Sequence, residues 1–579
     1  MQQNKSTKDF SDLKIIISDS EKMTSSLTDM MKVFNLKKYF SVFNQLKSKG
    51  VKVSNLLNIL VLLPFYGIAS VYALYSSGIK TSDFQGQKDV YYDIKNNEYI
   101  DWRQLLLLLS KRFKYLVNKN VNLISSGVTA IIFDDTLIEK TGKKIEKVGF
   151  VNDHVSGRFI LGFKLLVCGF WDGASFIPLD FSLHRERGSK QEKLQKEYKK
   201  AQNNLISIEK LLEKAQSTLK IKEEQLLKAQ YAIDNKPSKS NQTKFDNAKL
   251  SYDKAKTKLD LLQKELSTKK HISIEAQQKI KRYYAKGKLF GLTTKERKAQ
   301  HKKEVAKGSH GNIRRRETDI DKISSMLKML KRVVKSGFIP NFVLTDSWFS
   351  CLDLLVTLRD LENGSIKLIS MVRINNQLFT DVSGRKMPVT KIPEIYRKQT
   401  QYSRKLKSQY IKVACFYQGI RVNLFYIKMG KSTKWHLLLT TDLNLNFVKL
   451  MEIYQIRWSI EVFFKESKQY LKIGDCKSST FDAHIADITV SMIQYIMLSY
   501  FKRLNYMQSI GNIFKDVSKE MIEMDLVSRL LEIFWGLIEL LCEMASFDFM
   551  LFQEEALSNE IIFTKMLRLL PESRLNKVA

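Results

Sequence analysis

Short apolar runs bounded by turn residues recur from residue 128 onward, a pattern typical of β-strands. The first run, VTAIIFDD, ends in two acids at Asp134 and Asp135. RFILGFKLLVCGF and SFIPLDFSLH follow on either side of a WDGA turn and predict a β-hairpin. NFVLTD repeats the first pattern and ends at Asp346. Four later runs between residues 366 and 443 predict further strands, namely LISMVRI, YIKVACFY, RVNLFYIKM and WHLLLTT.

Between residues 190 and 285, apolar or small residues recur at alternating steps of four and three, which is the seam of a coiled coil. A break around Pro237 divides the repeat into two arms of nearly equal length. They should fold back on each other as an antiparallel hairpin on the order of 60 Å long, inserted in a compact domain as a spacer or dimerisation arm. The seam residues are Leu194, Tyr198, Ala201, Leu205, Ile208, Leu212, Ala215, Leu219, Leu226, Ala229 and Ile233 in the first arm, and Phe245, Ala248, Tyr252, Ala255, Leu259, Leu262 and Leu266 in the second.

Helical patterns occupy the remaining segments. In the N-terminal part, basic segments lie on both sides of the apolar run 59–75, which contains Pro64 and Gly67. This run is too short and too interrupted to span a membrane comfortably, so it predicts a buried helix pair. The basic segments leave two alternatives, a DNA-binding head or a helical support domain. A further helix is expected over roughly 317–336, ending at Gly337.

The order of these elements predicts an α/β protein whose core is interrupted by insertions. Composition adds a polyanionic partner, because 96 Lys and Arg against 60 Asp and Glu leave a net charge of +36. Five scattered cysteines indicate neither a zinc site nor a disulfide framework. The predicted domains are a helical region 1–120, core segments 121–189, 286–375 and 434–505, a coiled-coil insertion 190–285, a β-strand insertion 376–433 and a helical C-terminal region 506–579.

The stretch YQIRWSIEVFFKESK, residues 454–468, predicts an amphipathic helix. At about 100° per residue, Tyr454, Arg457, Glu461 and Lys468 share one narrow stripe. A carboxylate flanked by two cations and a phenol could bind a metal ion and the phosphates around it. The alternative is a solvated helix face with ion pairs at helical spacing.

Three acids, Asp134, Asp346 and Glu461, thus end or face outward from predicted core elements. Carboxylates in such positions can hold two divalent cations about 4 Å apart, the arrangement that activates a water or 3′-hydroxyl in phosphodiester cleavage. Their carboxyl carbons would then lie within about 8 Å of one another. Either aspartate alone is more commonly a turn or cap residue, and Asp135 is the rival of Asp134 as the first ligand.

At these three positions the sequence resembles the DDE transposases of insertion sequences, specifically the IS-four family. The signature Tyr-x2-Arg-x3-Glu-x6-Lys of that family is filled by the stripe of residues 454–468. Its Asp-x-Thr element is matched by Asp134 and Thr136, and its second acid by Asp346. The coiled-coil hairpin is a departure without a counterpart in the family.

The resemblance implies a ribonuclease H-like mixed-sheet core. It also implies an enzyme that binds terminal inverted repeats, cleaves phosphodiester bonds with two Mg²⁺ ions, for which Mn²⁺ can substitute, and joins the 3′ ends to target DNA. Asp134, Asp346 and Glu461 would be the catalytic metal ligands, while Arg457 and Lys468, with Tyr454, would contact DNA. A homodimer would act on two element ends, in the cytoplasm at the nucleoid.

Two other functions stay open at this point. One is a catalytically inactive DNA-binding or architectural protein on the same fold, and the other is a hydrolytic nuclease without strand joining. Trp348 and Trp458, which lie beside the acids in the sequence, are expected as core aromatics, with stacking on an unpaired base as the alternative.

Overall fold

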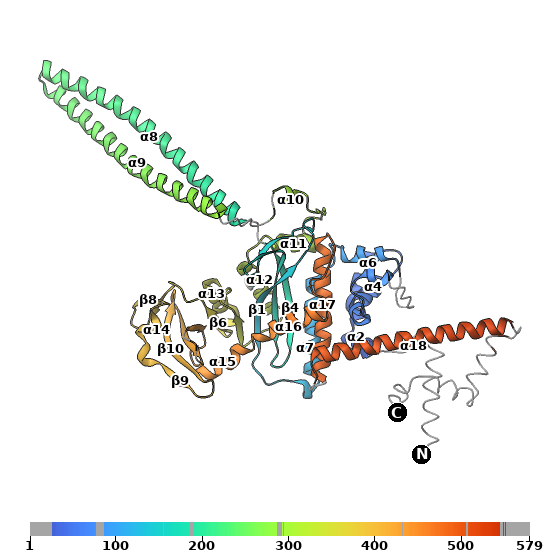
Figure 1. Ribbon diagram of the computed structural model, residues 1–579. Coiled ribbons are helices and arrows are strands. Elements are labelled where there is room, and N and C mark those ends of the chain that lie inside the picture. The colour runs from blue at the N-terminus through green and yellow to red at the C-terminus, as the bar shows by residue number, and fades with distance from the viewer. Residues whose placement is uncertain are drawn as a thin grey trace. The chain divides into compact units, whose positions relative to one another are not determined.

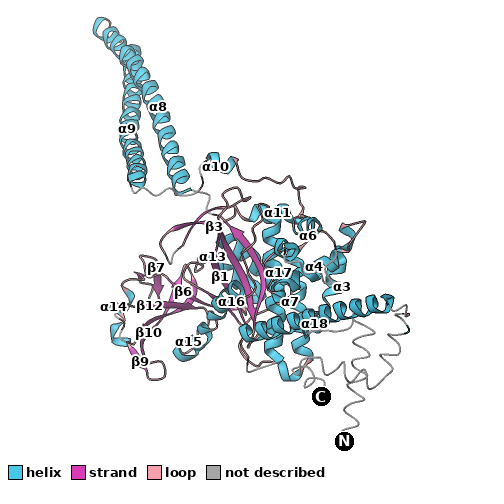
Figure 2. Cartoon of the chain, turned by 45° about the vertical axis from the view of Figure 1, so that its right-hand side comes forward, coloured by secondary structure: helices cyan, strands magenta, loops and turns pink. Residues whose placement is uncertain are grey.

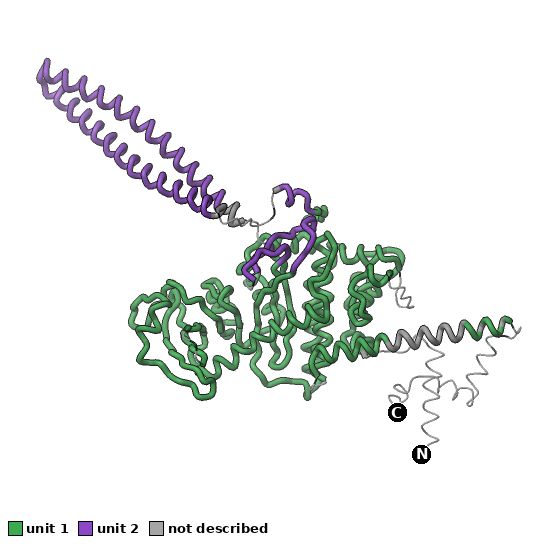
Figure 3. Tube along the Cα trace, viewed as in Figure 1, with its two compact units in different colours: residues 1–138, 164–184, 301–579 green, residues 139–163, 185–300 purple. Residues whose placement is uncertain are grey.

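The computed structural model describes residues 26–551 apart from 77–85, 154–155, 186–188, 286–291, 293, 431, 433, 505–507, 545–547 and 549–550. The chain divides into two compact units (Figure 3). One contains residues 1–138, 164–184 and 301–579, and is called the core unit below. The other contains residues 139–163 and 185–300, and is called the hairpin unit.

Three parallel strands form the centre of the sheet: β1 (Ala130–Glu139), β5 (Phe342–Thr345) and β6 (Lys367–Val372). β5 pairs with β1 on one side and with β6 on the other. The first four residues of β1 and all four of β5 are buried. Such burial on both faces explains why these strands appear in the sequence as continuous apolar runs rather than as alternating ones.

β3 (Phe159–Trp171) and β4 (Phe176–His184) confirm the predicted antiparallel hairpin. Its turn forms because Oδ1 of Asp172 accepts two backbone N–H groups of the turn. β3 is also the neighbour of β1 in the sheet. A short strand, β2 (Gly149–Asn152), pairs with the first residues of β3 and has no counterpart among the predicted strands.

The strands after residue 366 continue the same sheet in the order β6, β12, β11, β10, β7, β8. Figure 2 shows the strands in magenta. The segment 376–433, expected as a β-strand insertion, is therefore hydrogen-bonded through β12 to the core strand β6. Two helices follow the last of these strands in the chain, α15 (Phe447–Gln455) and α16 (Trp458–Gln469). These outer strands are β7 (Leu378–Asp381), β8 (Lys386–Pro388), β9 (Gln401–Ser403), β10 (Ser408–Tyr417), β11 (Ile420–Met429) and β12 (His436–Thr440).

The N-terminal helices belong to the core unit, where the last of them packs on the sheet and the earlier ones pack on other helices (Figure 1). α7 (Trp102–Lys119) contacts β4 and α17 (Phe481–Leu504), because its apolar face, including Leu106 and Phe113, is buried. This packing fits the support-domain alternative. The apolar run 59–75 forms the end of α4, a 3₁₀ turn and most of α5, in agreement with the predicted helix pair. The helices before α7 are α2 (Ser26–Phe34), α3 (Leu36–Ser41), α4 (Val53–Leu62), α5 (Val71–Ser76) and α6 (Lys88–Lys95).

The prediction of a single helix over roughly 317–336 is wrong about where that helix begins. The chain forms two helices instead, α11 (His310–Glu317) and α12 (Lys322–Lys335). The second helix begins at Lys322 because the Asp321 side chain accepts the N–H of Ser324 and caps it. Its end is as predicted, since Gly337 follows with a φ of +91°. α13 (Leu352–Asp360) lies between β5 and β6 in the sequence.

The hairpin unit contains the predicted coiled coil as α8 (Ser189–Asn235) and α9 (Lys239–Ala285), which pack against each other. The arms are equal in length, 47 residues each. Seam residues such as Ala201, Ile208 and Ala215 are buried, whereas their neighbours are exposed. A short helix, α10 (Thr294–Lys298), also belongs to this unit.

The C-terminal region contains one long helix, α18 (Ile510–Met544), as far as the structure describes it. Much of the predicted helical region 506–579 lies outside the described residues. Among the helices of the described ranges, none combines the length and the apolar character that crossing a bilayer requires.

Candidate active site

Two of the predicted site residues extend from neighbouring parallel strands at the same level. Ile132 of β1 pairs with Leu344 of β5, and Asp134 and Asp346 each follow two residues later. Because side chains alternate between the faces of a sheet, both aspartates lie on the same face as their paired neighbours. The sheet register therefore brings together two carboxylates that are far apart in the sequence.

Asp134 is a mostly buried carboxylate with one cationic partner. Its Oδ2 lies 2.9 Å from Nη1 of Arg457, and its Oδ1 accepts the N–H of Asp135 at 2.8 Å. Burial raises the pKa of Asp134 to about 7, and the charge of Asp346 adds to the increase although Arg457 opposes it. The positive charge nearby is thus too small to keep the pKa of this carboxyl group in its ordinary range.

Asp346 occupies the turn that follows β5. Its Oδ1 accepts the N–H of Trp348 at 2.9 Å, so it plays the turn role expected of an isolated aspartate. It forms no ion pair with any side chain that the structure describes. A carboxylate that lies beside a second carboxylate and has no cationic partner can bind a cation from solution.

The helix predicted over 454–468 is broken in the structure, so this prediction is wrong in detail. α15 ends at Gln455 and α16 begins at Trp458, with Arg457 in the turn between them. The N–H of Arg457 bonds to the carbonyl of Tyr454 at 3.1 Å, a 3₁₀-type contact that tightens the chain there. The break aims Arg457 at β1, whereas Tyr454 stays on the preceding helix.

Arg457 bridges two of the three predicted metal ligands. One guanidinium nitrogen contacts Asp134, and another contacts Glu461 one helical turn further along α16. Glu461 remains 32% exposed at its side chain. We call Asp134, Asp346, Glu461 and Arg457 the acidic cluster, because three carboxylates accompany a single arginine, which pairs with Asp134 and Glu461.

The other two stripe residues contact the backbone of the same strands. Nζ of Lys468 donates to Oγ1 of Thr136 at 2.7 Å and to the carbonyl of Leu137 at 3.0 Å. The hydroxyl of Tyr454 donates to the carbonyl of Thr345 at 3.3 Å. Burial raises the pKa of Tyr454 to about 12. Both residues therefore fasten their helices to β1 and β5.

Asp135, the rival of Asp134, is directed to a different partner. It forms an ion pair of 2.9 Å with Lys322, the first residue of α12. Nζ of Lys322 also lies 4.7 Å from the ring centre of Trp348, and Arg373 lies 4.8 Å from the same ring. No local sequence pattern indicated Lys322 or Arg373, since each meets its partner only through the fold.

The two tryptophans beside the acids are not core residues, contrary to the expectation. Trp348 is 41% exposed and Trp458 is 62% exposed. Trp348 lies against Lys322 and Arg373, and stacking of either tryptophan on an unpaired base stays a prediction.

The fit of a divalent metal to the acidic cluster is partial. The donors are of the right kind, because hard cations such as Mg²⁺ prefer carboxylate oxygens. The lack of an ion pair at Asp346 also leaves room for added positive charge. However, no three acidic, histidine or cysteine side chains within the described ranges form a group that could hold a metal ion as they stand. Arg457 lies between Asp134 and Glu461 instead.

Comparison with known proteins gives one match. Residues 314–497 match the model of a protein family described as Transposase DDE domain. The match includes Asp346, Glu461 and the rest of the stripe, but it does not include β1 with Asp134. No curated protein matches the chain significantly. The mixed sheet with its flanking helices is consistent with a ribonuclease H-like transposase. The comparison supports a DDE transposase as the class of this protein.

Proposed function

We propose that the protein is a DNA transposase of the IS-four type that cleaves phosphodiester bonds at the ends of its element and joins the 3′ ends to target DNA. The observation that carries the proposal is the equal level of Asp134 on β1 and Asp346 directly after the neighbouring parallel strand β5, with Glu461 connected to Asp134 through Arg457. Asp134 and Asp346 lie close enough for the charge of Asp346 to raise the pKa of Asp134, and such a pair serves no purpose in packing unless a cation joins it.

Asp134, Asp346 and Glu461 are the residues that would hold two Mg²⁺ ions. Bound there, the ions supply an activated water or 3′-hydroxyl and stabilise the leaving oxygen. Asp346 is positioned by the turn after β5, where its second oxygen is left for a ligand. Asp134 is positioned by β1 and Glu461 by α16, so rigid elements support all three.

Arg457 keeps the acidic cluster assembled before DNA and metal arrive. Its two ion pairs hold Asp134 and Glu461 at a fixed separation and offset part of their repulsion. As a planar cation, it can also bind a phosphate oxygen once the carboxylates are neutralised by metal. Lys468 supplies a second positive charge from the other end of α16.

The partner implied by this chemistry is duplex DNA, both as element end and as target. The net charge of +36 favours phosphate contacts through the release of counterions. Transposition joins two ends, so a homodimer in the synaptic complex is part of the proposal.

The deciding experiment compares Glu461→Gln with wild-type protein on DNA that carries the element ends, in the presence of Mg²⁺. Glutamine keeps the shape of the side chain but cannot replace the carboxylate on the metal. We expect cleavage to be abolished while binding to end DNA is retained. Glu452→Gln on α15 is the matched control, because Glu452 pairs with Lys405 outside the acidic cluster.

Products of the same reaction separate the transposase from the two alternatives. Joined donor and target molecules would establish strand transfer, and cleavage without joining would indicate a hydrolytic nuclease. Binding without cleavage by the wild-type protein would favour an architectural protein. Normal cleavage by Glu461→Gln would exclude the acidic cluster as the active site.

A further inference from the structure

The two arms of the hairpin unit, α8 and α9, lie side by side and leave a broad face on either side of their seam (Figure 1). Partly or fully buried residues recur along the seam in both arms, so the seven-residue repeat assigns the other residues to a face. Because the arms are antiparallel, equivalent positions of the repeat lie on the same side of the hairpin. One face contains every seventh residue counted from Glu197 and Lys200 in α8 and from Lys244 and Asn247 in α9. We call it the basic face.

The face on the other side of the seam, which we call the mixed face, differs in charge. It contains every seventh residue counted from Gln195 and Lys199 in α8 and from Lys239 and Gln242 in α9. Between residues 194 and 282, the mixed face has seven lysines and seven acids, whereas the basic face has eight cations and three acids. Exposed apolar side chains are present on both faces, so charge alone distinguishes them. The surplus of positive charge on this pair of faces lies entirely on the basic face.

The cations of the basic face recur in register on both arms. Lys200, Lys214 and Lys228 follow one another on α8 at steps of 14 residues, which is about 21 Å along a helix. Lys228 and Lys244 lie at nearly equal distances from the turn that joins the arms, and so do Lys214 and Lys258. All eight cations are exposed, and none forms an ion pair with a side chain that the structure describes. The basic face is therefore open to an anionic partner from solution.

This arrangement favours a long polyanion over a second copy of the hairpin. Two basic faces would repel each other, and a mixed face, which is neutral in sum, would attract a basic face only weakly. Duplex DNA carries one negative charge per about 1.7 Å of its axis. Arms of 47 residues extend for about 70 Å. A face of this length can contact phosphates over about two turns of a duplex.

We propose that the basic face of the hairpin binds the phosphate backbone of duplex DNA independently of its base sequence. A lysine carries a point charge on a flexible stem, which neutralises phosphates without reading bases. The choice of DNA among polyanions rests on the proposed function, but binding by this face needs neither metal nor the acidic cluster. The hairpin thus supplies a non-specific DNA contact in addition to serving as a spacer.

The test is a gel-shift titration of the full chain on a duplex that is longer than the basic face and carries no element end, in EDTA and at several salt concentrations. The combined variant Lys214→Gln, Lys228→Gln and Lys258→Gln removes three cations of the basic face and keeps side chains that favour a helix. We expect the slope of log K against log salt to fall by about two to three. The affinity at about 0.1 M salt should fall at least about tenfold.

The matched control is the combined variant Lys220→Gln, Lys249→Gln and Lys256→Gln, which removes the same charge from the mixed face. It should bind with the slope of wild type, because the acids of the mixed face already repel phosphates. Circular dichroism should show the helix content of wild type in both variants, since only exposed side chains change.

Arginine at the three altered positions of the basic face should restore the wild-type slope, because it keeps the charge. If the combined glutamine variant loses helix content, single replacements decide the question, each with an expected decrease in slope of about one. Equal slopes for the basic-face and mixed-face variants would overturn the proposal. Loss of binding to phosphatidylserine vesicles with unchanged duplex binding would also overturn it and indicate a membrane surface. Failure of the wild-type protein to cleave DNA would contradict the proposed function but would leave these slopes unchanged.

Discussion

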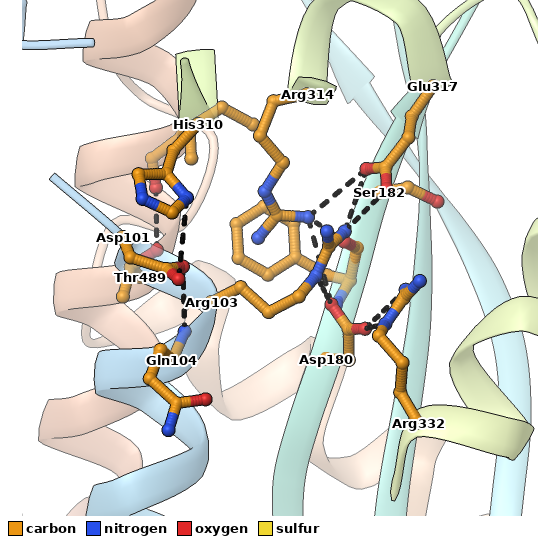
Figure 4. Close-up of polar contacts among 12 residues, drawn as sticks. Asp101, Arg103, Gln104, Asp180, Ser182, His310, Arg314, Glu317, Arg332 and Thr489 are labelled. Atoms are coloured by element: carbon orange, nitrogen blue, oxygen red, sulfur yellow. Dashed lines mark hydrogen bonds and ion pairs between the residues drawn. The ribbon is translucent and has the colours of Figure 1, made fainter. Parts of the chain in front are cut away.

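The acidic cluster can be compared with a second charged group of the core unit, which we call the arginine cluster. It consists of Arg103, Arg314, Arg332, Asp180 and Glu317 (Figure 4). In the first, three carboxylates accompany one arginine, which pairs with two of them, and the pKa of Asp134 rises to about 7 through burial and the nearby Asp346. In the second, burial opposes ionisation, but three arginines together lower the pKa of Asp180 to about 2. The acidic cluster contains fewer cations than carboxylates, and the arginine cluster contains more cations than carboxylates.

This difference separates a site that can receive a ligand from a group that holds the fold together. Asp180 is 3% exposed, and both of its oxygens are bound by arginines from α7 and α12. The arginine cluster thus fastens these helices to β4. Asp346 in the acidic cluster forms no ion pair with a described side chain, so a cation from solution has a place there.

The same substitution should have opposite effects in the two clusters. Asp134→Asn is expected to lower DNA cleavage by a factor on the order of a thousand or more, because the amide cannot serve the metal. Its free energy of unfolding should change by less than about 1 kcal/mol, since Arg457 keeps Glu461 as a partner. Cleavage assays and denaturant titrations measure both quantities. Asp353→Asn, an exposed residue of α13, should change neither. Wild-type cleavage by Asp134→Asn would show that the acidic cluster is not the active site.

Asp180→Asn should instead lower the free energy of unfolding by about 3–5 kcal/mol, because it leaves buried arginines without their carboxylate. Urea denaturation measures the loss. Asp360→Asn is the control, since Asp360 is exposed and should change stability by no more than about 0.5 kcal/mol. A loss as small as that of the control would mean that the arginine cluster does not fasten the helices.

The effect of pH sharpens this prediction. The pKa of Asp180 is about 2 in the fold, whereas its ordinary value is 3.8. The carboxylate therefore stabilises the folded protein fully at pH values above 3.8. This contribution is lost as the pH falls through the folded-state pKa. The stability difference between wild type and Asp180→Asn should therefore be full at about pH 5 and decrease toward pH 2. A constant difference over that interval would contradict the assignment.

Arg457→Ala and Lys468→Ala should weaken binding to end DNA by a smaller amount. Each loss of a phosphate contact lowers the slope of log K against log salt by about one. Gel-shift titrations at several salt concentrations measure the slope. Lys449→Ala is the matched control, because Lys449 is exposed on α15 and pairs with Glu452 outside the acidic cluster. Unchanged affinity and slope in both variants would leave the stripe as a solvated helix face.

Replacement of residues 189–285 by a short flexible linker should have the smallest effect. Both clusters lie in the core unit, outside this segment, and a short linker has a low closure cost. We expect the shortened protein to remain folded and to bind Mn²⁺ as the full chain does, measured by circular dichroism and calorimetry. An insoluble product, or one that no longer binds Mn²⁺, would mean that the hairpin is part of the core.

Local patterns in the sequence were sufficient for most elements. The seam of α8 and α9, the hairpin of β3 and β4 and the apolar strands before Asp134 and Asp346 follow from periodicity and turn residues. The predicted strand end at Asp134 is wrong, because β1 continues to Glu139. These signals are local because a helix or strand buries one face at a fixed repeat. Boundaries were less certain, as the break at Arg457 and the separate helices α11 and α12 demonstrate. A single 3₁₀ turn or cap changes them without altering the apolar repeat.

The sequence by itself therefore determined the strands, the coiled coil and the candidate acids, but only the tertiary structure decided their partners. Arg457 meets Asp134 across 323 positions, and Asp135 meets Lys322 across 187. The arginine cluster likewise joins segments far apart in the chain. No periodic pattern specifies such contacts, because they depend on which elements the sheet and its helices bring side by side. The balance of charge at each cluster, and with it the difference between ligand site and structural support, exists only after folding.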